Sequence, residues 1–164
     1  MRILGVDPGT VHTGFGMIDE VSGSLDFLDC GVIRTSPAQP IPYRLKQIYS
    51  GLQRVIEQHS PDVISIEDIF IARNVRSALK LGHARGVAIL AAINHDLEVF
   101  EYTPTEVKKS IVGYGRAGKD QIQQMVKHLL SLSNPPKQHD ASDALALAIC
   151  HSHSRKMRQR VSEV

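Results

Sequence analysis

The amino-acid sequence predicts an α/β fold, with one mixed sheet of about five strands and helices covering both faces. Three strand-like segments follow one another within the first 34 residues, which predicts an antiparallel meander. Helical and strand-like segments then alternate, which predicts parallel strands joined by helical crossovers. With 164 residues, 42% of them hydrophobic, the chain can bury a substantial core in one domain.

The predicted strands are short, mostly apolar segments bounded by turn-forming residues. Pro8-Gly9 cannot continue the first strand, so Asp7 lies where that strand ends. The stretch DEVSGS, residues 19–24, predicts the turn between the second and third strands. Glu67 closes the fourth strand, whose sequence DVISIE is typical of a buried strand. The predicted strands cover residues 2–7, 13–19, 25–34, 62–67 and 98–102.

Two long helices are predicted between these strands. Apolar side chains recur at helical spacing over residues 45–56, which predicts an amphipathic helix that ends near residue 60. Residues 76–95 are rich in Ala, Leu and Ile and predict a second helix, which contains Gly82 and Gly86. Its small side chains allow another helix to approach closely, either within the fold or across a dimer.

The last third of the chain predicts three further helices. Thr103 and Glu106 form a capping-box pattern around Pro104, which predicts a short helix that ends at about residue 112. A glycine-rich loop follows at 113–118. The next predicted helices cover residues 119–132 and 139–158, separated by the Asn-Pro-Pro at 134–136.

The composition is that of an ordinary globular protein rather than of a membrane or disordered protein. The longest apolar stretches, such as 87–93, are far too short to span a membrane, and the N-terminus lacks the pattern of a signal peptide. We therefore expect a cytoplasmic location and no membrane partner. Cys30 and Cys150 lack the spacing of a metal site, so we expect free thiols.

Local clusters of basic residues, rather than the net charge of +2, suggest a nucleic-acid partner. Each cluster taken alone also fits a solvated helix face. Lys119 begins a predicted helix, where a cation opposes the helix dipole, so a role toward phosphate is favoured there. The clusters are Arg73, Arg76, Lys80 and Arg85; Lys108, Lys109, Arg116 and Lys119; and Arg155, Lys156, Arg158 and Arg160.

Four carboxylates are predicted to meet at one edge of the sheet. Asp7 and Glu67 end two strands, and parallel neighbouring strands would bring both to the N-terminus of the last helix, where Asp140 and Asp143 lie three residues apart. Asp7 alone also fits a turn-opening residue, and Asp140 a helix cap. Converging carboxylates repel one another, and Mg²⁺ or Mn²⁺ would neutralise them and support phosphodiester hydrolysis.

Four stretches of the sequence resemble the RuvC family, the bacterial Holliday junction resolvases or crossover junction endodeoxyribonucleases. These are ILGVDPGTVHTGFGMI, ISIEDIFIARNVRSALKLGHARGVAI, VFEYTPTEVKKSIVGYGRAGKDQIQQMV and DASDALALAICH, in order between residues 3 and about 153. The resemblance implies a ribonuclease H-like fold and a homodimer that resolves four-way DNA junctions by paired symmetric nicks, in recombination and repair. It also implies Mg²⁺, with Mn²⁺ as a substitute, and a branch-migration complex of the RuvA and RuvB type as a partner on the bacterial nucleoid.

The resemblance assigns roles to individual residues. It implies that Asp7, Glu67, Asp140 and Asp143 are the catalytic, metal-binding acids, that Lys108 and Lys119 are functional lysines, and that Phe70 stacks on the junction. Without it, Phe70 reads as a core residue and Lys108 as a solvated lysine. Arg73, Arg76 and Lys80 follow helical steps away from Glu67, which suits a track for DNA phosphates.

Other readings of the same residues stay open at this point. Asp-Pro-Gly-Thr at 7–10 also resembles the first phosphate loop of sugar kinases and actin-like ATPases, which need two such domains. A junction-binding scaffold or a nuclease acting on RNA–DNA hybrids would share the predicted fold. Cys150, His151 and His153 are poorly spaced for zinc. We expect one nuclease domain over 1–154 and a short, basic, flexible tail over 155–164.

Overall fold

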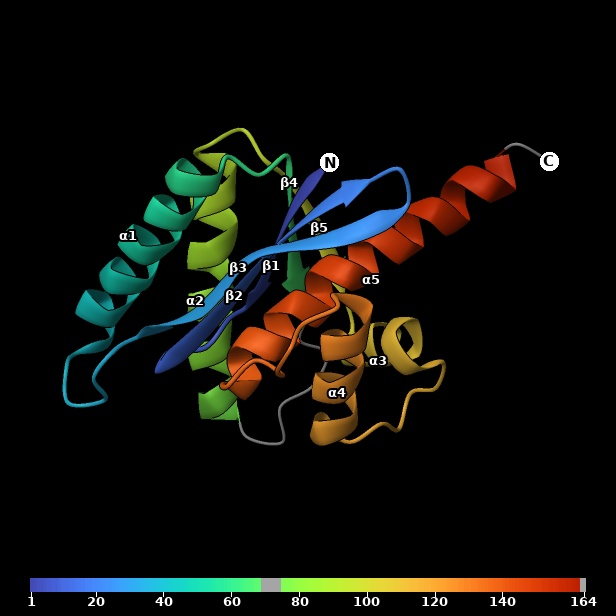
Figure 1. The fold of residues 1–164 in the computed structure, drawn as a ribbon. Helices are drawn as coiled ribbons and strands as arrows, with labels where there is room; N and C mark the ends of the chain where they lie inside the picture. The colour runs from blue at the N-terminus through green and yellow to red at the C-terminus, as the bar shows by residue number, and fades with distance from the viewer. Residues whose placement is uncertain (69–74, 163–164) are drawn as a thin grey trace.

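The fold is described from a computed structural model, for residues 1–68 and 75–162 and for side chains as far as Met157. Its described part contains a five-stranded mixed sheet in the order β3-β2-β1-β4-β5, with helices on both faces (Figure 1). This arrangement confirms the predicted α/β class. The strands are β1 (Arg2–Asp7), β2 (His12–Val21), β3 (Ser24–Arg34), β4 (Val63–Glu67) and β5 (Glu98–Tyr102).

The strand directions bring β1 and β4 to an end at the same edge of the sheet. β1 pairs antiparallel with β2, placing Asp7 opposite Gly14. β1 also pairs parallel with β4, in a register that matches Val6 with Ile66. β4 then pairs parallel with β5. Because parallel strands finish on the same side, the residues that follow Val6 and Ile66 are neighbours there.

The turn between β2 and β3 is tighter than the sequence predicted. Only Ser22 and Gly23 lie outside the strands, with φ angles of 50° and 91°. Two successive residues with positive φ are typical of the two-residue type I′ turn, whose twist matches that of the flanking strands. The predicted loop over 19–24 is therefore wrong in length, because strand pairing continues as far as Val21 and Ser24.

Helices cover the sheet in two layers, visible on opposite sides in Figure 1. One layer packs on Leu4, Val6 and Ile64, and the other on Ile3, Ile18 and Val63, as expected for strands whose side chains alternate between faces. The first layer consists of α1 (Ile41–His59) and α2 (Val75–Ile93). The second consists of α3 (Pro104–Val112), α4 (Lys119–Leu129) and α5 (His139–Ser162). None of the described helices is long and apolar enough to cross a membrane.

Helix α5 lies in direct backbone contact with the sheet because glycines face it. A Cβ atom added to Gly5 would lie 1.9 Å from the carbonyl oxygen of Ala144, and one added to Gly14 would lie 2.0 Å from that of Asp140. Any larger residue at these two positions would force the helix away from β1 and β2. The glycines therefore set the depth at which the start of α5 approaches the end of β1.

The helix boundaries follow the sequence signals closely at some ends and less closely at others. The capping box at α3 is present, since the Thr103 side chain accepts from the Glu106 backbone and the Glu106 side chain accepts from the Thr103 backbone. α4 ends at Leu129, three residues earlier than predicted, and α5 continues to Ser162, four residues beyond the predicted end. The flexibility of the tail stays a prediction.

Candidate active site

Three of the four predicted acids line one cavity of about 290 Å³. Asp7 comes from the end of β1, Glu67 from the end of β4, and Asp143 from near the start of α5. Side chains along a strand alternate between the two faces of the sheet, so residues two apart lie on the same face. Gly5 on β1 and Ser65 on β4 both contact α5. Asp7 and Glu67 each follow one of these residues by two positions, which places their side chains on the α5 face as well. The other lining residues are Pro104, Val107, Lys108, Lys119, Ile122, Ala146 and Leu147.

The three acids are partly buried and influence one another electrostatically. Burial, followed by the charges of Glu67, Asp143 and Asp140, raises the pKa of Asp7 to about 8, against an opposing effect of Lys119. The pKa of Glu67 is raised by burial and by Asp143. Burial also raises the pKa of Asp143, while Lys119 lowers it. Such displaced pKa values are characteristic of sites where a cation or a reacting group is expected.

Asp140 lies at the rim rather than in the cavity. Its side chain is 38% exposed, and its Oδ2 atom lies 3.9 Å from Nδ1 of His12. The other ring nitrogen of His12 lies 3.3 Å from a guanidinium nitrogen of Arg34. Since Arg34 can only donate, that ring nitrogen is the acceptor and the ring proton lies on the side of Asp140. The structure thus separates the two aspartates that the sequence placed together, although the charge of Asp140 still reaches Asp7.

The turn that follows β1 is stabilised without the Asp7 carboxylate. Thr13 Oγ1 donates to the carbonyl oxygen of Gly9 over 2.7 Å, and Thr10 accepts from the buried guanidinium of Arg44. Within the described part of the chain, no hydrogen bond engages the side chain of Asp7. This favours the cavity-lining interpretation of Asp7 over the turn-opening one.

Two lysines, from α3 and α4, also line the cavity. Lys119 is the first residue of α4, after Gly118, and its Nζ atom lies 3.6 Å from Oδ2 of Asp143. Its side chain is 71% exposed, so it can reach both the acids and a ligand at the mouth. Lys108 lines the cavity from α3 and, like Lys119, lowers the pKa of Glu67.

The donor set of the cavity fits a hard divalent cation that is shared with a substrate. Among the described residues, no group of three His, Cys, Asp or Glu side chains is placed to hold a metal ion by itself. Mg²⁺ does not need such a cage, since it usually binds one or two carboxylates together with water and substrate phosphate. Asp7, Glu67 and Asp143 supply carboxylates of this kind at one cavity, where a divalent charge would relieve their repulsion.

Without a cation, the stability of the protein should fall as the pH rises. The pKa of Asp7 is raised from 3.8 to about 8 in the folded state, so its stabilising effect is complete below pH 4 and is lost by about pH 8. Asp7→Asn should therefore unfold at a higher temperature than wild type in EDTA, by a margin that grows from pH 4 to 8 and then levels off. The full shift corresponds to at most about 6 kcal/mol.

Thermal unfolding in EDTA at several pH values measures this margin, with Asp26→Asn as the exposed control. A margin that is independent of pH would contradict the raised pKa of the partly buried Asp7.

The predicted DNA-binding residues are only partly described. Phe70 and Arg73 lie outside the described residues. Arg76 and Lys80 are exposed on the first turns of α2. Arg85, which the sequence grouped with them, instead pairs with Glu101 at 2.6 Å and with Asp68 at 3.6 Å, so it belongs to the structural ion pairs.

Cys150, His151 and His153 each contact other side chains in the described structure. His151 is buried, and its Nδ1 lies 2.9 Å from the hydroxyl of Tyr102. His153 contacts Ser110. Cys30 and Cys150 are both free, as expected.

Sequence reasoning missed the residues that support the acids. The close contact with α5 could have been predicted from the sequence, because Gly14 and Gly16 lie within a strand, where glycine marks a close approach of another backbone. The positions of His12 and Arg34 near Asp140 could not, because they depend on how β2, β3 and α5 pack together.

Comparison with known proteins places this geometry in a family. The family model described as "Crossover junction endodeoxyribonuclease RuvC" matches residues 3–151. The RuvC of Alkaliphilus oremlandii is 53% identical over 94% of both chains. That of Syntrophotalea carbinolica is 56% identical over 93% of this chain and 94% of its own. The structure of Thermus thermophilus RuvC in complex with a Holliday junction substrate superposes with a TM-score of 0.90, at 31% identity over 96% of both chains. The chain therefore belongs to the RuvC family of crossover junction endodeoxyribonucleases.

Proposed function

We propose that this protein resolves four-way DNA junctions in recombination and repair, by hydrolysing one phosphodiester bond in each of two opposed strands. The observation that carries this proposal is one cavity that is lined by three partly buried carboxylates and two lysines. Support comes from the relatives, which are named crossover junction endodeoxyribonucleases, and from the similar Thermus protein, which was solved with a Holliday junction.

The acids would bind the divalent cation on which hydrolysis depends. Asp7, Glu67 and Asp143 would hold Mg²⁺, with Mn²⁺ as a substitute, and Asp140 would complete the set from the rim. When bound, the cations supply an activated water and neutralise charge on the phosphate and the leaving oxygen. The four carboxylates fix the position of that charge, and the apolar wall formed by Val107, Ile122 and Leu147 limits access of bulk water.

The lysines and the basic start of α2 would bind the DNA backbone. Lys119 and Lys108 would place positive charge beside the phosphate whose P–O bond breaks, which stabilises the charge that develops there. Arg76, Lys80 and Arg73 would contact neighbouring phosphates, and Phe70 would stack on a base at the junction.

A homodimer is proposed from an unpartnered apolar stripe on α2. Val75, Leu79, Leu90 and Ile93 are 76%, 60%, 53% and 55% exposed, which is unusual for large apolar side chains on one helix. Gly82 and Gly86 lie on the same stripe, and a Cβ added at either would meet open space. The steps of three and four residues are those of a helix-pairing seam. A two-fold axis through this seam would give two active sites for two opposed cuts.

The double variant Leu79→Glu/Leu90→Glu should be monomeric. Burying these side chains against a second copy contributes about 1.5–3 kcal/mol for each leucine, so dimer affinity should fall at least about a hundredfold. Sedimentation velocity at several concentrations measures the dissociation constant. Met157→Glu, which changes an equally exposed apolar residue away from the stripe, should remain dimeric. A dimeric double variant would contradict the proposed seam.

The function itself is tested by a panel of substrates. Wild-type protein should cut a labelled four-way junction in Mg²⁺ or Mn²⁺ but not in EDTA, and should leave a linear duplex and an RNA–DNA hybrid intact. Tight junction binding without cleavage would instead support a scaffold. Cleavage restricted to the hybrid would support a ribonuclease.

We also propose a cytoplasmic location on the bacterial nucleoid and a branch-migration complex of the RuvA and RuvB type as a partner. Support for both is the family membership alone. Recovery of such a complex with the tagged protein from cells, and its loss when junctions are absent, would test the second.

A further inference from the structure

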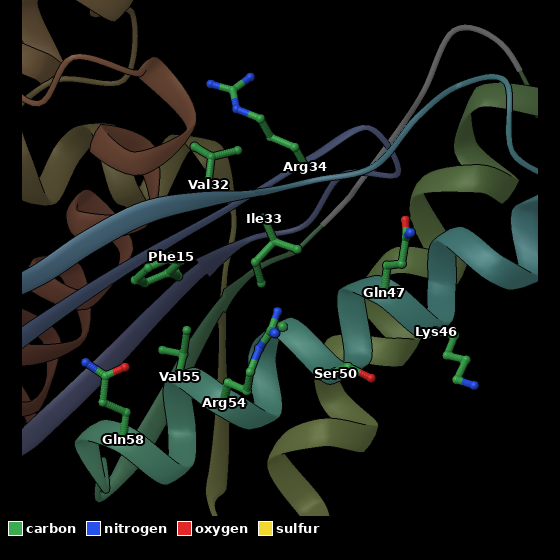
Figure 2. A pocket seen from close by; sticks show the side chains of 11 residues that line it. Phe15, Val32, Ile33, Arg34, Lys46, Gln47, Ser50, Arg54, Val55 and Gln58 are labelled. Atoms are coloured by element: carbon green, nitrogen blue, oxygen red, sulfur yellow. The ribbon is translucent and has the colours of Figure 1, made fainter.

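A second hollow, distinct from the acidic cavity, lies between β3 and α1. It has a volume of about 710 Å³, and we call it the α1/β3 groove. Phe15 and Ile33 reach into it from the strands and Val55 from the helix, so the floor is apolar (Figure 2). Its helix side is polar and includes Arg54, whereas the side chain of Arg34 projects from β3 to the side away from α1 (Figure 2).

The charge of the α1/β3 groove has one sign. Lys46 and Arg54 are exposed lining residues on α1, and no carboxylate is among the described residues that line the groove. Within the part of the chain that the structure describes, no ion pair engages either cation. Because the net charge of the whole chain is only +2, two such cations on one side of one helix are a local concentration of charge.

The donors follow the length of the helix instead of surrounding one point. Lys46, Ser50 and Arg54 recur every four residues, so they lie along one side of α1. Lys46 and Arg54 are separated by about 12 Å along the helix axis. The side chains of Gln47 and Gln58 add further hydrogen-bond donors. An extended ligand with regularly spaced negative charges fits this row better than a compact anion does.

The α1/β3 groove and the acidic cavity lie on opposite faces of the sheet, and Arg34 lies at the edge between them. Arg34 is the last residue of β3, and its side chain contacts His12, which lies beside Asp140 at the rim of the acidic cavity. A polymer that runs from the cavity around this edge of the sheet would meet Arg34 first, and the cations of α1 after it.

We propose that the α1/β3 groove binds the phosphate backbone of one duplex arm of the DNA substrate. The identity of the polymer as DNA rests on the proposed function. DNA is favoured over an acidic protein segment because cations, amides and a hydroxyl in a row match phosphate oxygens, and because Arg34 lies at the sheet edge between the α1/β3 groove and the candidate cleavage site. This assigns DNA contacts to Lys46 and Arg54, on the opposite layer of the fold from α3 and α4, and to Arg34 at the edge of the sheet.

The salt dependence of junction binding tests this assignment. Binding of a fluorescent four-way junction is measured in EDTA at several salt concentrations, so that no cleavage occurs. Lys46→Gln/Arg54→Gln should bind about tenfold more weakly than wild type at low salt, and the slope of log affinity against log salt should shrink by about two. Lys127→Gln, which removes a cation on α4, is the matched control and should keep the wild-type slope.

The outcomes separate this inference from the proposed function. Thermal melts should show that the double variant is folded, because both substituted side chains are exposed. If wild type cuts junctions and the slope of the double variant is unchanged, the α1/β3 groove does not bind DNA, and an acidic protein segment becomes its expected occupant. If wild type cuts no junction, the proposed function fails, while a reduced slope on linear duplex would still support the groove.

Discussion

Asp7→Asn should lower the rate of junction cleavage by about a thousandfold while junction affinity in EDTA stays within about threefold of wild type. The amide has the shape of the carboxylate but lacks its charge, so the cavity keeps its form and loses a ligand for the cation. Asp7 is the acid on which Glu67, Asp143 and Asp140 all act. It therefore lies where the negative potential of the site is concentrated.

Single-turnover cleavage of a labelled junction in Mg²⁺ measures this loss. Asp26→Asn, an exposed aspartate on β3, should cut at the wild-type rate. If Asp7→Asn retained cleavage within tenfold of wild type, Asp7 would not be a cation ligand. If it lost binding and folding together with cleavage, Asp7 would instead be a structural turn residue.

Gly5→Val should destabilise the protein by at least about 3 kcal/mol, enough to leave much of it unfolded at 37 °C. A Cβ at this position would lie 1.9 Å from the Ala144 carbonyl oxygen and 2.9 Å from the Ala148 amide nitrogen. Backbone atoms of a helix cannot rotate away as a side chain can. α5 would therefore have to lift off β1, and it would carry Asp143 out of the cavity.

Urea denaturation followed by circular dichroism measures the free energy of unfolding for this variant. Gly118→Ala is a suitable control, since its Cβ would meet nothing nearer than 3.9 Å and its φ angle of −74° suits alanine. The control should change stability by less than about 1 kcal/mol. A Gly5→Val protein as stable as wild type would show that α5 does not depend on this contact.

Local signals were enough to predict much of the fold. β1, β5 and α3 have the predicted bounds, because Pro8-Gly9, the apolar run at β5 and the capping box of Thr103 each act over a few residues. The meeting of Asp7 and Glu67 also followed, since it requires only that two neighbouring strands run parallel. These features depend on sequence neighbours or on one general rule of sheet topology.

Features that depend on packing between distant segments did not follow from the sequence. The three-residue spacing put Asp140 and Asp143 on one side of a helix, yet only Asp143 lines the cavity. The difference arises from how α5 crosses the sheet, which sets Asp140 beside His12. In the same way, Arg85 looked like part of a basic stripe until the fold brought Glu101 within 2.6 Å of it.

The products formed from a supercoiled plasmid that extrudes a cruciform test junction resolution by this protein most directly. A dimer with two acidic cavities should nick two opposed strands during one binding event, so the plasmid should become linear in Mg²⁺. Independent nicks would relax the supercoil, reabsorb the cruciform and leave nicked circles. Linear product that requires the cruciform and the metal, and that disappears with Asp7→Asn, is the predicted result. Nicked circles alone, or cutting of a plasmid without a cruciform, would contradict the proposal that this chain resolves four-way junctions.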